Sequence, residues 1–155
     1  MPVRYNFDSI DPDTKHLNGE MDVHVLDKDQ NPNQVLETDI AWAVKVDWRI
    51  YGLDAPAIGG NWNIKVFVES MGPGPEKQVG AANVPVSDAA PSLDRHYTTT
   101  INMPAGTIAT DGHEDGVYKL VTVITHSNTG AGVTKRDKMA AFAEEPMLQF
   151  YTPQI

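Results

Sequence analysis

Cysteine is absent from this chain of 155 residues, which excludes disulfide frameworks, thiol nucleophiles and thiolate metal sites. Long hydrophobic runs are also absent, and nothing approaches the roughly 20 apolar residues that a membrane span needs. The first eight residues, Met1–Asp8, contain no apolar stretch of the signal-peptide kind. A cytoplasmic location is therefore the default expectation, while a trimmed secreted protein or a signal-independent export route stays open.

Positive charge is scarce, with 12 Lys and Arg against 21 Asp and Glu and a formal net charge of −9. An acidic surface repels phosphate backbones and anionic lipids, so we expect neither nucleic acid nor membrane as a partner. Hydrophobic residues make up 41% and charged residues 21%, which is ordinary for a folded globular protein. We expect a single domain over 1–155, with an N-terminal extension at 1–20 and an irregular excursion or edge strand at 71–93.

Short apolar runs separated by glycine and proline predict many strands joined by turns. The clearest run is Ile40–Gly52, in which one face carries Trp42, Val44, Val46, Trp48 and Ile50 and the other carries Lys45, Asp47 and Arg49. This period of two predicts a half-buried strand, whereas a helix would scatter these apolar residues around its circumference. Further strands are expected at 3–7, 21–26, 62–68, 78–86, 96–103, 116–126, 139–145 and 147–151.

The strand at 116–126 is apolar on both faces, which predicts a central position in its sheet. Gly-rich residues 127–133 predict a turn, and a charged stretch follows at 135–138. The segment 139–145 contains alanine and glutamate, which favour helix, but it is short and Pro146 follows it, so we expect a strand. The predicted fold is therefore all-β: a two-sheet antiparallel sandwich of about seven to nine strands without a disulfide.

The sequence Glu114-Asp115-Gly116-Val117-Tyr118-Lys119-Leu120 resembles the beginning of strand F in the immunoglobulin-like and fibronectin-type β-sandwich superfamily. The resemblance covers residues 20 to 152 and implies an immunoglobulin-like architecture, but no particular activity. It implies that Tyr118 is a corner tyrosine whose hydroxyl bonds back to nearby backbone. It also implies that Leu120 and either Val46 or Trp48 occupy the positions of the missing cysteines, and that Trp62 is the buried tryptophan of strand C.

Alternating oxygen-bearing side chains follow the first clear strand, at Asp27, Asp29, Asn31 and Asn33. Calcium loops use such residues, since Ca²⁺ takes six to eight oxygen ligands. An EF-hand register starting at Asp27 fails, however, because its sixth place lacks glycine and its twelfth place is Thr38 rather than glutamate. We therefore expect a polar hairpin turn.

A second acidic cluster, Asp111-Gly112-His113-Glu114-Asp115, could in principle hold a metal, but adjacent loop residues rarely converge on one ion. We expect a solvated loop there. The five histidines show neither HxH nor HExxH spacing: His16, His24, His96, His113 and His126. Of these, His24 and His126 fall on expected strands and are expected to be half-exposed. The serines lack a nucleophile-elbow or triad context: Ser9, Ser70, Ser87, Ser92 and Ser127. We therefore expect no catalytic residues, no cofactor and no metal.

Aromatic side chains divide between the two sides of the strands. Trp42, Trp48 and Trp62 follow the apolar alternation towards the core, while Tyr51, Phe67 and Tyr151 point outward. An outward Phe67 beside Val121 and Val123 predicts an apolar patch, which usually marks a protein contact. The alternative is that the N-terminal segment or the 71–93 stretch covers this patch.

These observations favour a non-enzymatic protein-interaction or structural module, either by itself or as a subunit of a larger assembly, with a protein partner or self-association. One alternative is a calcium-dependent or carbohydrate-binding β-sandwich module that uses the acidic loops. A small hydrolase is a second alternative, which would require a concave pocket with perturbed titratable groups.

Overall fold

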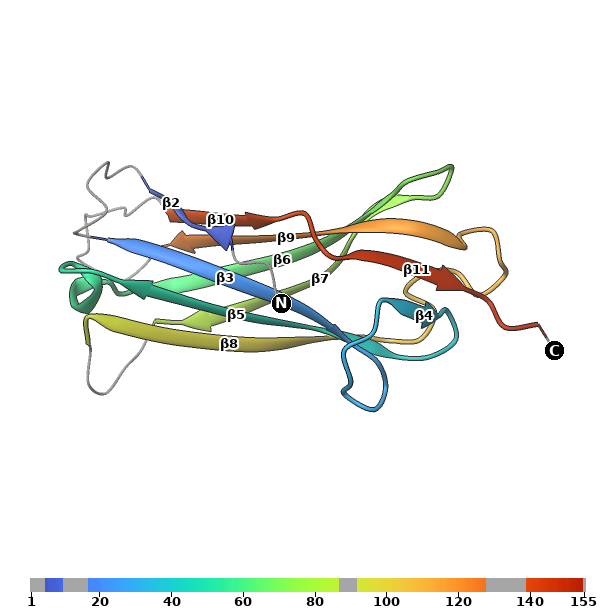
Figure 1. The fold of residues 1–155 in the computed structure, drawn as a ribbon, viewed down its shortest axis with the longest axis horizontal. Helices are drawn as coiled ribbons and strands as arrows, with labels where there is room; N and C mark the ends of the chain where they lie inside the picture. Colours follow the sequence, from blue (N-terminus) through green and yellow to red (C-terminus); the bar gives the residue numbers. More distant parts are fainter. Residues whose placement is uncertain (1–4, 10–16, 87–91, 128–138, 155) are drawn as a thin grey trace.

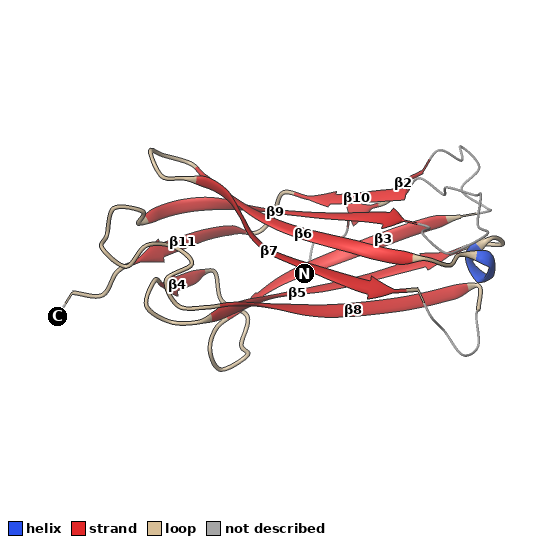
Figure 2. Cartoon of the chain, turned by 180° about the vertical axis from the view of Figure 1, so that it is seen from behind, coloured by secondary structure: helices blue, strands red, loops and turns tan. Residues whose placement is uncertain are grey.

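The computed structural model describes residues 5–9, 17–86, 92–127 and 139–154, and in these ranges the chain forms two packed β-sheets. Figures 1 and 2 show the sheets as two elongated layers, with the C-terminus at one end and the 3₁₀ turn η1 (Ala55–Ala57) at the other. No helix in the described ranges has the length and apolar character of a membrane span. The predicted all-β, two-sheet sandwich is confirmed.

The four-stranded sheet has the order β1–β3–β5–β8 and is antiparallel throughout. Its strands are β1 (Tyr5–Asn6), β3 (Asn18–Leu26), β5 (Trp42–Tyr51) and β8 (Asp94–Met103). Strand β5 lies in the middle, with Trp48 opposite Met21 of β3 and Tyr97 of β8. The alternation predicted for β5 is confirmed, because its five apolar residues at even positions are buried and Lys45 is exposed.

The seven-stranded sheet is centred on β9 (Gly116–Ser127), which pairs with β6 along one edge and with β10 and β11 end to end along the other. The remaining members are β2 (Asp8–Ser9), β4 (Val35–Glu37), β6 (Asn61–Ser70), β7 (Glu76–Pro85), β10 (Met139–Ala143) and β11 (Met147–Tyr151). The central position predicted for this strand is confirmed. Strand β7 pairs with β6 alone among the described strands, so it is an edge strand within the 71–93 stretch.

The core between the sheets is one cluster of buried apolar residues drawn from both layers. Trp62 lies at its centre, fully buried, with its ring centroid 6.2 Å from Trp48, 5.8 Å from Phe7 and 5.7 Å from Tyr97. All three tryptophans are buried, as the alternation predicted. Aromatic pairs of this kind contribute beyond the area that they bury, so this cluster fixes how the two sheets pack.

The corner tyrosine behaves as the resemblance implied. The hydroxyl of the fully buried Tyr118 donates a hydrogen bond to the Glu114 carbonyl oxygen at 2.5 Å. Burial also raises the pKa of this phenol above its usual value. Leu120 on β9 is buried, as are both Val46 and Trp48 on β5 of the facing sheet, the two residues that the resemblance offered for the second missing cysteine.

The structure also differs from the predicted strands. Strand β3 begins at Asn18 rather than at residue 21, and β4 was not predicted. The pairing of β4 with β11 is parallel, which corrects the expectation of a wholly antiparallel sandwich. Strand β4 could not be predicted because it is only three residues long, too short to show alternation, and its partner β11 lies near the C-terminus of the chain. Residues 128–138, with the predicted charged stretch and most of the predicted turn, lie outside the described ranges.

Candidate functional site

The outer face of the four-stranded sheet carries a row of charged side chains across three strands. Glu20 of β3, Arg49 of β5 and His96 of β8 occupy matching register positions, so they line up across the sheet. Arg49 Nε donates to Glu20 Oε1 at 2.7 Å, and Arg49 Nη1 donates to Asp94 Oδ2 at 2.9 Å. The guanidinium also lies 4.4 Å from the ring centroid of Tyr51. These contacts hold the arginine in one orientation.

Electrostatics reinforce this row. The hydrogen bond that Arg49 donates to Glu20 is the main cause that raises the pKa of Arg49 above its usual value, so the guanidinium stays charged. His96 Nε2 lies 3.1 Å from Asp94 Oδ1, so the Asp94 carboxylate contacts both Arg49 and His96. The result is a connected row of polar groups across three strands: Glu20, Arg49, Asp94 and His96.

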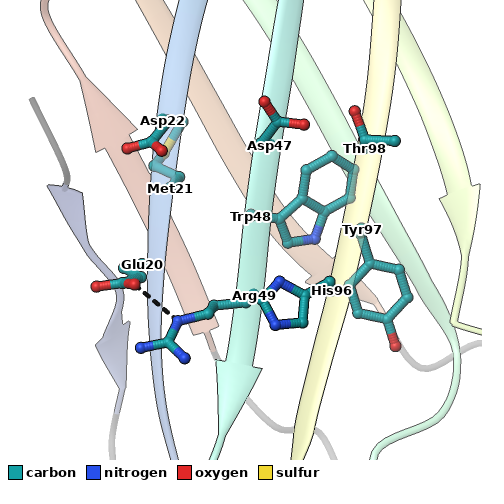
Figure 3. A pocket seen from close by; sticks show the side chains of 9 residues that line it. All are labelled: Glu20, Met21, Asp22, Asp47, Trp48, Arg49, His96, Tyr97 and Thr98. Atoms are coloured by element: carbon teal, nitrogen blue, oxygen red, sulfur yellow. Dashed lines mark hydrogen bonds and ion pairs between the residues drawn. The ribbon is translucent and has the colours of Figure 1, made fainter. Parts of the chain in front are cut away.

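A second row lies beside the first. Asp22 of β3, Asp47 of β5 and Thr98 of β8 are register neighbours, and Figure 3 shows all three projecting from the same side of the sheet as Arg49 and His96. A depression of about 700 Å³ spans both rows, with the backbone of the three strands as its floor. Its size falls within the range of small-molecule pockets in proteins. Nine residues line it: Glu20, Met21, Asp22, Asp47, Trp48, Arg49, His96, Tyr97 and Thr98.

The chemistry of this depression is that of a polar recognition surface. Three carboxylates against one guanidinium give its lining a net charge of −2 with a neutral His96, so anionic ligands are repelled. The carboxylates accept hydrogen bonds, whereas the arginine, the imidazole and the threonine hydroxyl can donate them. A ligand that presents many groups able both to donate and to accept would match this mixture.

The outer face of the seven-stranded sheet is different, because apolar side chains gather on it. Phe67 of β6 lies opposite Val121 of β9, and Val123 of β9 lies opposite Phe142 of β10. Phe142 is 55% exposed. The predicted grouping of Phe67 with the two valines is thus found, and β7 of the 71–93 stretch continues the sheet as a neighbour of β6 instead of covering this face. Met147 and Val117 extend the same face along β11 and β9.

The first acidic loop folds as a turn. Asp27 Oδ1 accepts hydrogen bonds from the backbone N–H groups of Asp29 at 2.9 Å and Asn31 at 3.0 Å, which lowers the pKa of Asp27. Asn33 Oδ1 accepts one from the Val35 N–H at 3.0 Å. These oxygens therefore organise the backbone of the turn, as expected of Asx-rich turns.

The three carboxylates of the second acidic loop, residues 111–115, each bind a different partner. Asp111 binds His113, Glu114 Oε2 accepts from the Ala109 N–H at 2.7 Å, and Asp115 accepts from the N–H and hydroxyl of Thr152. Within the described residues, no group of three or more His, Asp or Glu side chains could share a metal ion. The loop is thus held by its own pairings.

Exposed His113 forms an ion pair whose strength depends on pH. Its Nδ1 lies 3.0 Å from Asp111 Oδ2, and this hydrogen bond raises the pKa of His113 and lowers that of Asp111. The stabilisation is fully present below the unfolded histidine's pKa of about 6.5 and is lost as pH rises through the higher folded value. On the acid side, it is lost as pH falls through the depressed pKa of Asp111.

We expect Asp111→Asn to return the His113 pKa towards its ordinary value, measured from its imidazole proton shifts by NMR titration. Asp115→Asn is the matched control, because that carboxylate binds Thr152 and not His113. An unchanged His113 titration in Asp111→Asn would show that the pair does not form in solution.

The other predicted positions are dispersed. Ser70 Oγ accepts from two glycine N–H groups of its turn, and Ser127 Oγ accepts from Asn63. His24 and His126 are half-buried on β3 and β9, as predicted, and the His126 ring packs 5.0 Å from Trp62. His16 and Ser87 lie outside the described residues.

Sequence reasoning missed the polar depression. It placed Asp47 and Arg49 on the polar face of their strand but did not connect them with β3 and β8. Part of the signal was present in the same period of two, since Glu20 and Asp22 flank the apolar Met21, and His96 and Thr98 flank the aromatic Tyr97. What alternation could not supply was the pairing of β5 with these two particular strands.

Comparison with known proteins supports the fold alone. No family model and no curated protein matches the sequence. Among solved structures, the C-terminal domain of Wzt superimposes with a TM-score of 0.52 at 9% identity, covering 99% of this chain and 80% of that one. A β-glucosidase from Listeria innocua, solved with gluconolactone, gives a TM-score of 0.49 at 11% identity, over 87% of this chain and 17% of the enzyme. The chain is therefore a β-sandwich module, similar in fold to the Wzt domain.

Proposed function

We propose that the protein is a non-enzymatic binding module that holds a neutral glycan on the outer face of its four-stranded sheet. The observation that carries this proposal is the depression of about 700 Å³ lined by Glu20, Asp22, Asp47, Arg49, His96 and Thr98. A sugar hydroxyl both donates and accepts, so neighbouring hydroxyls can bind a carboxylate and a guanidinium or hydroxyl at the same time. The excess of carboxylates disfavours phosphorylated, sulfated and acidic sugars.

The shape of the site favours binding over cleavage. Glu20 is committed to Arg49, and Asp22 and Asp47 stand side by side on adjacent strands rather than on opposite walls of a cleft. Glycosidases place their two carboxyl groups on either side of the scissile bond. The face of a sheet supports a chain of sugars along its length and leaves the bonds between them open to solvent.

The test is binding to an array of neutral and anionic glycans, followed by titration of the best binder. We expect neutral glycans to bind, Asp47→Ala to weaken binding about tenfold or more, and Arg49→Ala to do the same, because each removes a charged hydrogen-bond partner. Glu76→Ala, an exposed carboxylate on β7 of the other sheet, is the matched control. The bound glycan should remain intact by mass spectrometry.

Three results would contradict the proposal. Binding restricted to anionic glycans would contradict the charge argument. Equal affinity of wild type and Asp47→Ala would show that the glycan does not bind on the face of the four-stranded sheet. Cleavage of the glycan would overturn the non-enzymatic assignment. Running each titration in EDTA and in millimolar Ca²⁺ separates the calcium-dependent alternative, for which affinity would rise with Ca²⁺.

Protein interaction is the second candidate function, and the apolar outer face of the seven-stranded sheet favours it. That face lies on the opposite side of the sandwich from the depression, so one molecule could use both faces at once. Exposed apolar side chains grouped on one surface usually mark a contact with another protein.

A further inference from the structure

We infer that a second copy of this chain docks on the apolar outer face of the seven-stranded sheet, related to the first by a two-fold axis. This inference rests on the second candidate function above and names its partner. The face is defined by Lys65, Phe67, Glu69, Val121, Val123, Phe142 and Met147. Its centre is the row in which Phe67 of β6 lies opposite Val121 of β9.

The two charged residues that β6 contributes to this face are placed symmetrically about that row. Lys65 and Glu69 lie two residues before and two residues after Phe67 on β6, so all three project from the same side of the sheet. A two-fold axis in the plane of the interface, along the Phe67–Val121 row, reverses the strand direction of the second copy. Lys65 of each copy then faces Glu69 of its partner, which forms two opposite-charge pairs around the paired Phe67 rings.

The apolar groups follow the same symmetry. Phe142 is the neighbour of Val123, and Met147 is the neighbour of Lys119, two residues to either side of Val121 on β9. The same axis therefore sets Phe142 of one copy on Met147 of the other. Lys119 Nζ is drawn aside to Glu144 at 3.7 Å, which leaves its aliphatic stem to cover apolar surface.

The geometry is one that sheets adopt. Two sheets pack face to face about 10 Å apart with their strands within about 30° of alignment. A two-fold axis that lies in the interface, perpendicular to the strands, aligns the strands of the two copies in opposite directions. A two-fold interface uses the same patch on both copies, so it must be self-complementary. A face with lysine and glutamate placed equally about an apolar centre meets that requirement.

The test is sedimentation equilibrium of the full chain with charge-reversed variants. We expect wild type to dimerise, and Lys65→Glu and Glu69→Lys each to weaken the dimer about tenfold, because each creates two like-charge pairs. The double variant K65E/E69K should restore the affinity of wild type. Lys45→Glu, the same charge change at an exposed position on the other sheet, is the matched control.

Phe142→Ser tests whether the apolar face takes part in dimerisation, independently of the two-fold pairing of charges. Far-UV circular dichroism of every variant checks that it folds. A wild type that stays monomeric at all concentrations would overturn the inference. If Phe142→Ser dimerises as tightly as wild type, the dimer uses another surface, and the inference is overturned. A dimer that Phe142→Ser weakens but that the double charge reversal does not restore would keep the face as a protein-binding surface and overturn the two-fold pairing.

Discussion

Replacing Trp62 by alanine is expected to lower the free energy of unfolding by about 3–5 kcal/mol, the range for deleting a large buried aromatic side chain. The indole is fully buried on β6 of the seven-stranded sheet, and its ring packs against Trp48 and Tyr97 of the four-stranded sheet. Its loss opens a cavity between the two layers. Relaxation is limited, because the strands on both sides are held by their hydrogen-bonded neighbours.

Urea unfolding followed by far-UV circular dichroism measures this effect. Leu53→Ala is the control, because Leu53 is 62% exposed and its truncation should change the stability by no more than about 0.5 kcal/mol. Trp62→Phe should lie between wild type and Trp62→Ala, since it keeps most of the aromatic contact. A loss below about 1 kcal/mol for the alanine variant would mean that Trp62 does not join the two sheets.

The half-buried strands could be predicted because their faces meet different environments. In β5 each even-numbered residue from Trp42 to Ile50 is buried in the core, whereas Lys45, Asp47 and Arg49 face outward. The period-two alternation of the sequence therefore corresponds directly to the two faces of the strand. Strand β9 was predicted to be central on a different ground, because it is apolar on both faces. Its outer residues Val121 and Val123 are half-buried.

Other features depend on contacts between distant parts of the chain. Strand β4 exists because Val35–Glu37 pairs with Gln149–Tyr151, more than 100 residues later, and a three-residue strand has too few positions to show alternation. The polar depression likewise required knowing that β3 and β8 flank β5. Alternation assigns each side chain to a face, whereas the choice of neighbouring strands arises from packing of the whole sandwich.

The outer faces of the two sheets differ in their chemistry. The face of the four-stranded sheet carries charged and hydroxyl groups, among which Arg49 is held between Glu20 and Asp94. The face of the seven-stranded sheet carries Phe67 and Phe142. Because the faces are separated by the core, substitutions on one should leave the other's binding unchanged, and the two proposals can succeed or fail independently.

Arg95 is a buried charged residue at the start of β8, one residue before the strand predicted from the sequence. It is 3% exposed on β8, and its Nη1 donates to the carbonyl oxygens of Ala55 at 3.1 Å and Ile58 at 2.7 Å. Its guanidinium lies 5.8 Å from the ring centroid of Tyr97. These bonds anchor the turn η1 over the end of the sandwich, because a buried carbonyl needs a donor.

We therefore expect Arg95→Met to lower the free energy of unfolding by about 2–3 kcal/mol, because it keeps the volume but removes a charged donor from two carbonyls. Hydrogen exchange should show the loss locally, with the Ile58 amide, which donates to Ala55 O, exchanging faster than amides of β9. His96→Met is the matched control on the neighbouring, exposed position of the same strand. Equal stability of the two methionine variants would show that Arg95 contributes bulk alone, and that the turn is held by its own backbone hydrogen bonds.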